Sequence, residues 1–305
     1  WPDLSGPSQE RMAEFRFLVD RGLIERQMPR SLACLLVVLA ALLPSCHSRT
    51  TQAHAPGLEL LQQRDMLRTR ALQSTNPLPS MESIEQRTVQ TSSGPVTLQV
   101  YQPGGQDLPI VLLIPSIDFT AGDIVTHDHV ARTLAAETPA LVILPSLPLE
   151  PENTRREVIN ASFDVLSWTH GRVERWGGNL DCILLVGEGA GAALATKLAQ
   201  RDRDGEKQLS GLVLLTPSFG EEGLPMAHSL RDLPATYVFL GEDDPLGHEG
   251  DALVDAMTSR DMRVSVRRQG GIGALRMDWA LADPELLQIM LEVAATIRKA
   301  CSPRE

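Results

Sequence analysis

A glycine-rich segment between an apolar stretch and an expected helix is the first place where this sequence could do chemistry. Gly187, Gly189 and Ala192 have the G-x-G-x-x-A spacing with which a strand-to-helix turn holds the pyrophosphate of a dinucleotide. That arrangement also requires an acidic residue at the end of the next strand, where it binds the ribose. The next apolar stretch ends Leu215-Thr216-Pro217 and has no acid. A nucleotide-binding α/β protein therefore stays only as a second alternative.

Histidines and cysteines offer two further kinds of chemistry. His127 and His129 form an H-x-H pair, but no further ligand at a suitable spacing completes a metal site, so we expect a helix surface there and no metal or other cofactor. Cys182 lies in an expected buried strand, where free cysteine commonly packs as an apolar side chain. It could instead pair with Cys301 in an oxidising compartment, and the sequence leaves this open because it does not fix their Cα separation.

The elements that must position these residues alternate regularly. Two stretches of alternating polarity flank Ser92-Ser93-Gly94-Pro95, which predicts a hairpin, and the later continuous apolar runs are typical of strands buried on both faces of a parallel sheet. The expected strands are residues 84–91, 96–101, 110–114, 140–144, 182–186, 212–215, 237–240 and 264–268. The expected helices are 126–137, 158–173, 191–201, 250–259 and 284–300, with N-caps at Thr126 and Asp283. This order predicts an α/β, doubly wound, mostly parallel sheet with helices on both faces.

Seven segments along these elements follow a recognisable order. They are PSIDFTAGD at 115–123, THD at 126–128, PE at 151–152, Trp168, GEGAGA at 187–192, DPLGHEG at 244–250 and GIGAL at 271–275. They resemble the HGGGFxxGD, THD, APEH, tryptophan, GDSAGG, DPLxDEG and IHGF segments of the hormone-sensitive-lipase-like esterase and lipase family. The resemblance implies an α/β-hydrolase fold over residues 81–303. The family's helical cap is expected to be minimal or absent, because only residues 217–234 separate the two strands that would flank it.

The departures from this family concern its catalytic groups. Ester hydrolysis on this fold needs a nucleophile, a base, an acid and an oxyanion hole. The resemblance places the serine at Gly189 and the histidine at Gly273, and glycine has no side chain to attack or to accept a proton. No histidine follows His248, whereas Asp244 keeps the position of the acid.

The oxyanion hole has also changed. Ser116, Ile117 and Ala190 occupy its positions, and the family's glycines are missing from the first loop. Ile117 disfavours the positive φ that turns an N–H toward a developing anion, and Asp118 would bring a carboxylate close to it. Only the N–H of Ala190 is expected to remain as a donor.

The charged residues near these positions also have ordinary structural interpretations. Asp244 before Pro245 is a common turn former, and His248 suits a surface loop. Glu188 could be a carboxylate nucleophile, but it is expected to point away from the place of the serine, toward solvent or a backbone N–H.

A targeting segment precedes these elements. From Met28 the chain reads MPRSLACLLVVLAALLPSC, in which Arg30 supplies a positive charge and residues 31–43 an apolar core. That core is too short to span a bilayer, and a buried apolar helix is the other interpretation. Residues 43–46 resemble the lipobox of bacterial lipoproteins, which implies a lipid on Cys46. The resemblance also implies a membrane attachment in the cell envelope, on the periplasmic side, with the outer membrane expected.

Four segments are therefore expected. Residues 1–27, which begin with Trp1, are interpreted as an upstream extension that is not native, and 28–45 as the signal peptide. Residues 46–80 are interpreted as a tether with a weak helix over 58–72, and 81–303 as the hydrolase-like domain.

The charge balance limits the partners. The chain has 28 basic and 39 acidic residues, a net charge of −11, and 4% aromatic residues. A nucleic-acid partner is excluded on this basis, because neutralising phosphates requires a basic surface. The sequence thus predicts a lipid-anchored α/β-hydrolase that has lost esterase activity and binds a small acyl or hydrophobic ligand, or a protein partner, at the vestigial cleft. The alternative is a carboxylic ester hydrolase with a rearranged active site.

Overall fold

The computed structural model describes residues 54–73, 77–115, 117–203, 209–220, 227–270 and 284–302. The expected upstream extension, the signal peptide and Cys46 lie outside these ranges. No helix within the described ranges combines the length and apolarity needed to cross a membrane.

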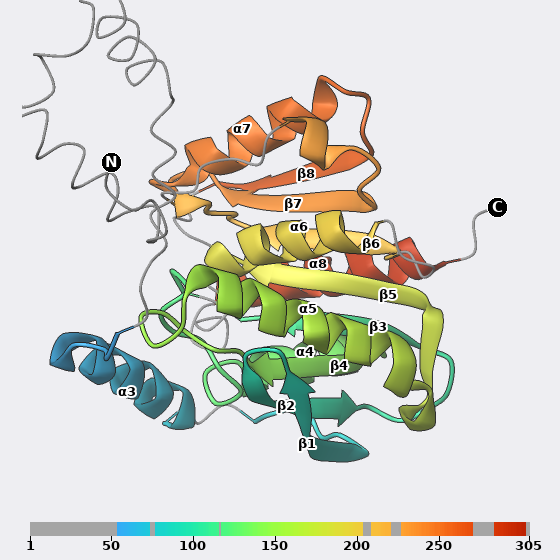
Figure 1. The fold of residues 1–305 in the computed structure, drawn as a ribbon. Coiled ribbons are helices and arrows are strands. Elements are labelled where there is room, and N and C mark those ends of the chain that lie inside the picture. Colours follow the sequence, from blue (N-terminus) through green and yellow to red (C-terminus); the bar gives the residue numbers. More distant parts are fainter. Residues whose placement is uncertain are drawn as a thin grey trace, which may run out of the picture. The chain divides into compact units, whose positions relative to one another are not determined.

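An eight-stranded sheet forms the centre of the described residues (Figure 1). Its strands are β1 (Ser83–Thr91), β2 (Gly94–Gln102), β3 (Leu108–Ile114), β4 (Leu141–Ser146), β5 (Gly178–Glu188), β6 (Gly211–Leu215), β7 (Ala235–Gly241) and β8 (Val264–Gln269). They lie in the order β1-β2-β4-β3-β5-β6-β7-β8. The pairs β1–β2 and β2–β4 are antiparallel and the others are parallel, so the predicted hairpin and the mostly parallel sheet are confirmed.

Helices cover both faces of the sheet. The helices are α3 (Leu58–Leu72), α4 (Asp128–Glu137), α5 (Arg155–Arg172), α6 (Ala190–Asp202), α7 (Gly247–Thr258) and α8 (Pro284–Cys301), with short 3₁₀ turns η1 (Glu174–Trp176) and η3 (Ala227–Leu230). Helices α4 and α8 pack on one face, and α5, α6 and α7 on the other (Figure 1). The doubly wound architecture predicted from the sequence is therefore confirmed.

The continuous apolar runs follow from this two-sided covering. In β3, Ile110 and Leu112 belong to the core beneath α5, α6 and α7, whereas Val111 and Leu113 belong to the core beneath α4 and α8. Successive side chains of a strand point to opposite faces, so both faces need apolar residues. Within the described residues, all buried members of both cores lie between Val89 and Ile297.

The predicted start of α4 was wrong, and α5 and α7 each begin three residues before their predicted positions. Helix α4 begins at Asp128 with His127 as its N-cap, two residues after the predicted cap Thr126. The reason is a local turn in which the Asp123 carboxylate accepts hydrogen bonds from the backbone N–H groups of Val125 and Thr126, at 2.8 and 3.0 Å. An Asp side chain bonded to the backbone in this way competes with helix formation. The other predicted cap, Asp283, lies outside the described residues.

A disulfide joins the central sheet to one of the helices that cover it. Cys182 in β5 and Cys301 at the end of α8 are bonded, with their Cα atoms 5.6 Å apart, which is within the range that a disulfide bridges. The bond closes a loop with a sequence separation of 119 residues. Of the two possibilities that the sequence left open for Cys182, pairing is the one observed.

Candidate functional site

The turn from β5 into α6 has the shape of a nucleophile elbow. Gly189 has φ 53° and ψ −122°, a conformation that strains any residue with a side chain and that glycine adopts freely. The Gly189 carbonyl accepts hydrogen bonds from the N–H groups of Ala192 (3.1 Å) and Ser218 (3.0 Å), which fix the turn. The elbow therefore has the geometry that presents a nucleophile, but the residue at its apex has none.

Close packing at this elbow explains the glycine two residues before its apex, Gly187. A Cβ added to Gly187 would lie 2.4 Å from the carbonyl oxygen of Gly191, well inside contact distance. The end of β5 and the first turn of α6 thus approach too closely for any side chain at 187. Ala190 is the first residue of α6, so its N–H has no acceptor within the helix and remains a candidate oxyanion donor.

The loop at the position of the first oxyanion segment is folded onto itself. The Ile117 N–H donates to the Ala121 carbonyl at 2.8 Å, and the N–H groups of Thr120 and Ala121 donate back to the Ile117 carbonyl at 2.9 and 3.1 Å. These donors are used within the turn and are not presented to a substrate. The third oxyanion position from the sequence, Ser116, lies outside the described residues.

The left-handed positions in this loop differ from the expectation. Asp118 and Phe119 have positive φ values of 50° and 59°, and Ile117 does not take part. The Asp118 side chain is exposed, whereas Phe119 is buried beneath the Arg155 guanidinium, whose carbon lies 3.4 Å from the ring centroid. Arg155 also bonds both carboxylate oxygens of Glu150, which holds it over the ring.

Helix α3 holds this loop from outside. Its Arg64 donates to the carbonyl oxygens of Thr120 (2.6 Å) and Glu150 (2.8 Å) and forms a two-point ion pair with Glu152. Four residues along, Arg68 donates to the Asp123 carboxylate at 2.6 Å. The helix predicted weakly over 58–72 is confirmed, and interpreting residues 46–80 as a tether did not anticipate these contacts.

The charge on Asp123 is stabilised by these partners. Burial alone would raise the pKa of this carboxyl group. Hydrogen bonds from the Thr126 N–H and the Arg68 guanidinium outweigh that effect and hold the pKa below its usual value. The carboxylate therefore stays ionised and ties the start of α4 to α3.

The position of the catalytic acid is occupied by a turn. The Asp244 carboxylate accepts a hydrogen bond from the Leu246 N–H at 2.9 Å, and its carbonyl accepts from Gly247 at 2.9 Å. His248 is exposed, with Nδ1 3.3 Å from the Pro245 carbonyl. The Asp244 side chain thus does what an Asp before a proline does in many turns. The position of the base, Gly273, lies outside the described residues.

Glu188 and the two α4 histidines depart from their expected surroundings. Glu188 is 3% exposed and faces His127, with its Oε1 3.5 Å from Nε2 of that ring, so it does not point to solvent. His127 is fully buried and its Nδ1 lies 2.8 Å from the Thr126 hydroxyl. His129 is also buried, which corrects the prediction of a surface pair. Within the described residues no group of His, Cys, Asp and Glu could hold a metal ion.

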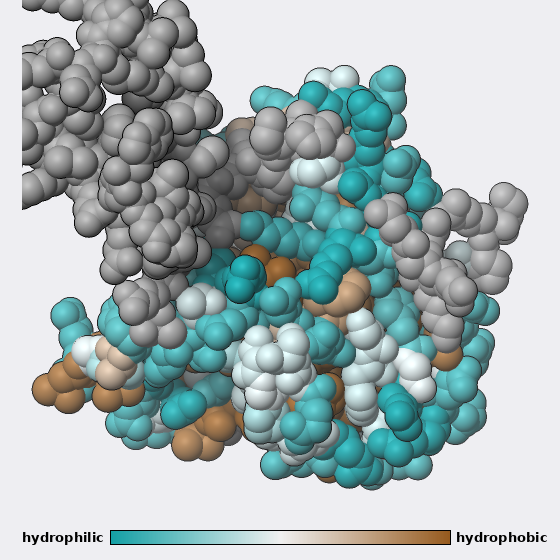
Figure 2. All heavy atoms as spheres, in the orientation of Figure 1, coloured by the Kyte–Doolittle hydropathy of each residue, from teal (hydrophilic) through white to brown (hydrophobic). Residues whose placement is uncertain are grey.

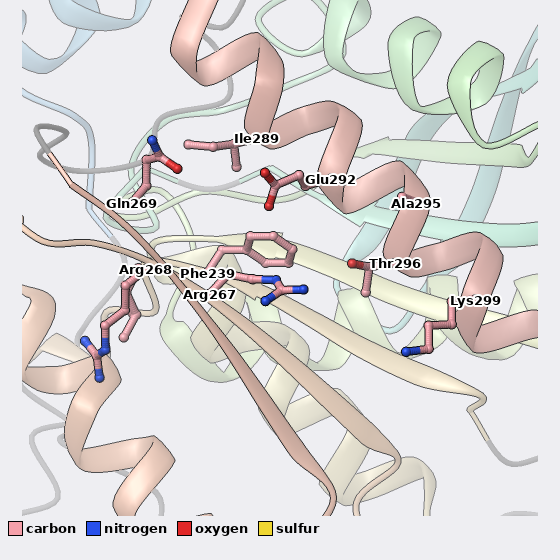
Figure 3. Close-up of a pocket in the computed structure, with 10 residues that line it drawn as sticks. Phe239, Arg267, Arg268, Gln269, Ile289, Glu292, Ala295, Thr296 and Lys299 are labelled. Atoms are coloured by element: carbon pink, nitrogen blue, oxygen red, sulfur yellow. The ribbon is translucent and has the colours of Figure 1, made fainter.

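The described cavities lie away from the elbow. A groove of about 470 Å³ runs between β8 and α8, and Phe239, Arg267, Glu292 and Lys299 point into it (Figure 3). A second cavity lies between β1 and α5, beside Trp168. Neither is lined by a residue of the predicted site. Between β6 and β7 the described residues form only the short turn η3, so the predicted minimal cap agrees with the structure.

The segment that contains this geometry is similar to a known protein family. The sequence profile described as "alpha/beta hydrolase fold" matches residues 118–225, which run from the folded loop through the elbow. The chain has the α/β-hydrolase fold. The elbow, with glycine at its apex, lies within the matched region.

Relatives and solved structures support the same assignment. The chain is 24% identical over 285 residues to "Carboxylesterase NlhH" of Mycobacterium tuberculosis, covering 77% of this chain and 89% of that protein. It is 29% identical over 150 residues to "Esterase LipI" of the same species, where the match spans only 46% of the relative's length. A solved esterase from Pyrobaculum calidifontis has a TM-score of 0.72 at 23% identity, covering 81% of this chain and 94% of that one. That structural likeness establishes the fold of this chain.

Proposed function

We propose that this protein is a catalytically degenerate α/β-hydrolase, held in the bacterial cell envelope by a lipid on Cys46, that binds a small acyl or hydrophobic ligand or a protein partner beside the elbow. The observation that carries the proposal is Gly189 at the apex of a turn with φ 53° and ψ −122°. The scaffold that positions a nucleophile is intact, and the nucleophile is missing.

Two further observations support the loss of catalysis. The N–H groups of Ile117, Thr120 and Ala121 are bonded within their own turn, so this loop offers little to a developing oxyanion. The sequence also has glycine at 273, where the family carries its histidine, and no histidine follows residue 248. Each loss alone lowers catalysis by orders of magnitude in hydrolases of this type.

Ester hydrolysis with rearranged groups is the second candidate. It is favoured by the names of the relatives and by Ser218, which is 8% exposed and whose N–H bonds the Gly189 carbonyl. A residue with a hydroxyl group is thus bonded through its backbone to the elbow. The serine hydroxyl would still need a base to accept its proton. His127 faces Glu188, the residue before the elbow apex, but its ring is fully buried.

An assay with a short-chain p-nitrophenyl ester separates the two candidates. We expect purified residues 47–305 to hydrolyse the ester no faster than buffer, because the residue at the apex of the elbow is a glycine and has no side chain to attack. Asp244→Asn and Ser218→Ala should not change the rate. Turnover well above background that disappears in either variant would support the rearranged esterase and contradict the proposal.

The lipid anchor has a test of its own. In a bacterial host, the full chain with Cys46→Ser should move from the membrane fraction to the soluble fraction, because the lipidated side chain is lost. Cys34→Ser, the same substitution in the apolar core of the expected signal peptide, is the matched control and should leave the protein on the membrane. If both variants fractionate like the unchanged protein, Cys46 is not the anchor.

A further inference from the structure

Exposed apolar side chains are concentrated on one segment of the described chain. Six large apolar side chains are exposed within the described residues, and five of them lie between positions 58 and 78. These five are Leu58, Leu61, Met66, Leu72 and Leu78, and the sixth is Leu246 at the start of α7. Brown side chains gather accordingly at the outer end of α3 in the lower left of Figure 2. Single exposed apolar residues are ordinary, but a concentration of this kind marks an interaction surface.

The exposed residues share one side of α3. At about 100° per residue, Leu58, Leu61, Met66 and Leu72 fall within an arc of about 140°. We call these four residues the outer face of α3. Leu58 is 72% exposed and Leu72 is 76% exposed, whereas Leu67 on the opposite side is buried against the domain. The outer face is therefore presented to the surroundings.

The docking of α3 holds this face in a fixed direction. Arg64, whose side chain is only 12% exposed, bonds two backbone carbonyls and a carboxylate of the domain. Arg68 adds the bond to Asp123, and the His54 N–H before the helix donates to the Pro151 carbonyl at 2.8 Å. A helix held in this way cannot turn its apolar residues inward.

The position of α3 in the chain indicates what covers the outer face. Cys46, the proposed lipid attachment site, precedes Leu58 by twelve residues. An extended chain of that length reaches at most about 40 Å, so an anchored protein keeps α3 close to the bilayer surface. The arc also includes the exposed polar residues Gln62, Asp65 and Thr69, so contact is expected at the level of the headgroups rather than by deep insertion.

We propose that the outer face of α3 rests on the phospholipid surface and so fixes the orientation of the domain on the membrane. This inference rests on the proposed lipid anchor for its argument of proximity. Arg64 and Arg68 bond α3 to the loop at 117–123. Contact of the outer face with the membrane therefore turns that side of the domain toward the bilayer. A ligand drawn from the membrane would then reach this side first.

The experiment is flotation with phospholipid vesicles. It uses residues 47–305, which contain all of the described buried core and lack Cys46, so that no lipid anchor contributes. Vesicles are made of phosphatidylcholine, with and without phosphatidylglycerol. The variant Leu58→Gln, Leu61→Gln, Leu72→Gln removes apolar area from side chains that make little contact with the domain. The matched control is Leu246→Gln, at the N-cap of α7, where the side chain is 44% exposed.

The unchanged protein should float with the vesicles, and the triple variant should bind roughly tenfold less or weaker still, while Leu246→Gln binds as before. Absence of vesicle binding by the unchanged protein, or equal binding by the triple variant, would overturn the inference.

Light scattering is measured on the same samples. If the unchanged protein is a dimer and the triple variant a monomer, with no vesicle binding, the outer face is an interface between two copies and the inference is wrong. Since Cys46 is absent throughout, failure here is distinct from failure of the lipid anchor.

Discussion

Gly187→Ala should lower the free energy of unfolding by about 3 kcal/mol or more. This lies at the upper end of the cost of adding one methyl group to a closely packed site. The added Cβ would lie 2.4 Å from the Gly191 carbonyl oxygen, and that atom is backbone that cannot rotate away. Relief requires the end of β5 and the start of α6 to separate, which disturbs the core on both sides of the elbow. For a domain of this size the melting temperature should fall by roughly 6–12 °C.

A second glycine provides the matched control. Gly171, near the end of α5, has no atom within 4 Å of the position of an added Cβ. Gly171→Ala should leave the melting temperature unchanged or raise it slightly, because alanine loses less backbone entropy in a helix. Calorimetry or circular dichroism measures both variants. Equal melting temperatures for the two variants would show that the close approach of β5 and α6 is not as the structure has it.

Breaking the disulfide should have an effect of similar size. Cys301→Ser removes a bond that closes a loop of 119 residues, and loops of this length correspond to a stabilisation of about 5 kcal/mol in the chain-entropy account. The bond also fixes the end of α8 to β5. We therefore expect the melting temperature to fall by roughly 10 °C or more.

Reduction gives the internal control for this prediction. The melting temperature of the unchanged protein should fall when a thiol reductant is added under conditions that open the bond. That of Cys301→Ser should not respond, because no bond remains to be reduced. These measurements use residues 47–305, in which Cys182 and Cys301 are the two cysteines. A melting temperature that does not respond to the reductant, with two free thiols counted after unfolding, would mean that Cys182 and Cys301 do not pair in solution.

Much of the fold could be predicted because each strand carries its own signal. The runs at 110–114 and 182–186 are apolar throughout, and they prove to be strands with cores on both faces. The sequence also contains a signal for the start of α5, which the prediction missed. Thr154 and Glu157 have the T-x-x-E spacing of a capping box and form one in the structure. The helix accordingly begins three residues before the predicted position. The start of α4 was misjudged because Asp123 captures the Thr126 N–H.

The candidate site was predictable only in part, for a physical reason. The apex at Gly189 follows from local sequence, since a glycine-rich turn between a strand and a helix has few alternatives. The direction of Glu188 does not, because it depends on His127, 61 residues earlier in the chain. The hydrogen bonds and the ion pair of Arg64 likewise depend on residues 56 to 88 positions away in the chain. Arginines on an otherwise weak helix were the one available signal.

The most direct test of the central claim is covalent labelling with a fluorophosphonate, followed by intact mass measurement of residues 47–305. This reagent phosphonylates the activated serine of a working hydrolase, because an activated hydroxyl displaces its fluoride. Our account predicts that the mass stays unchanged under conditions that fully label an active esterase run beside it. A stoichiometric adduct on one residue of the folded protein, such as Ser218, that is lost when the protein is unfolded first, would contradict it.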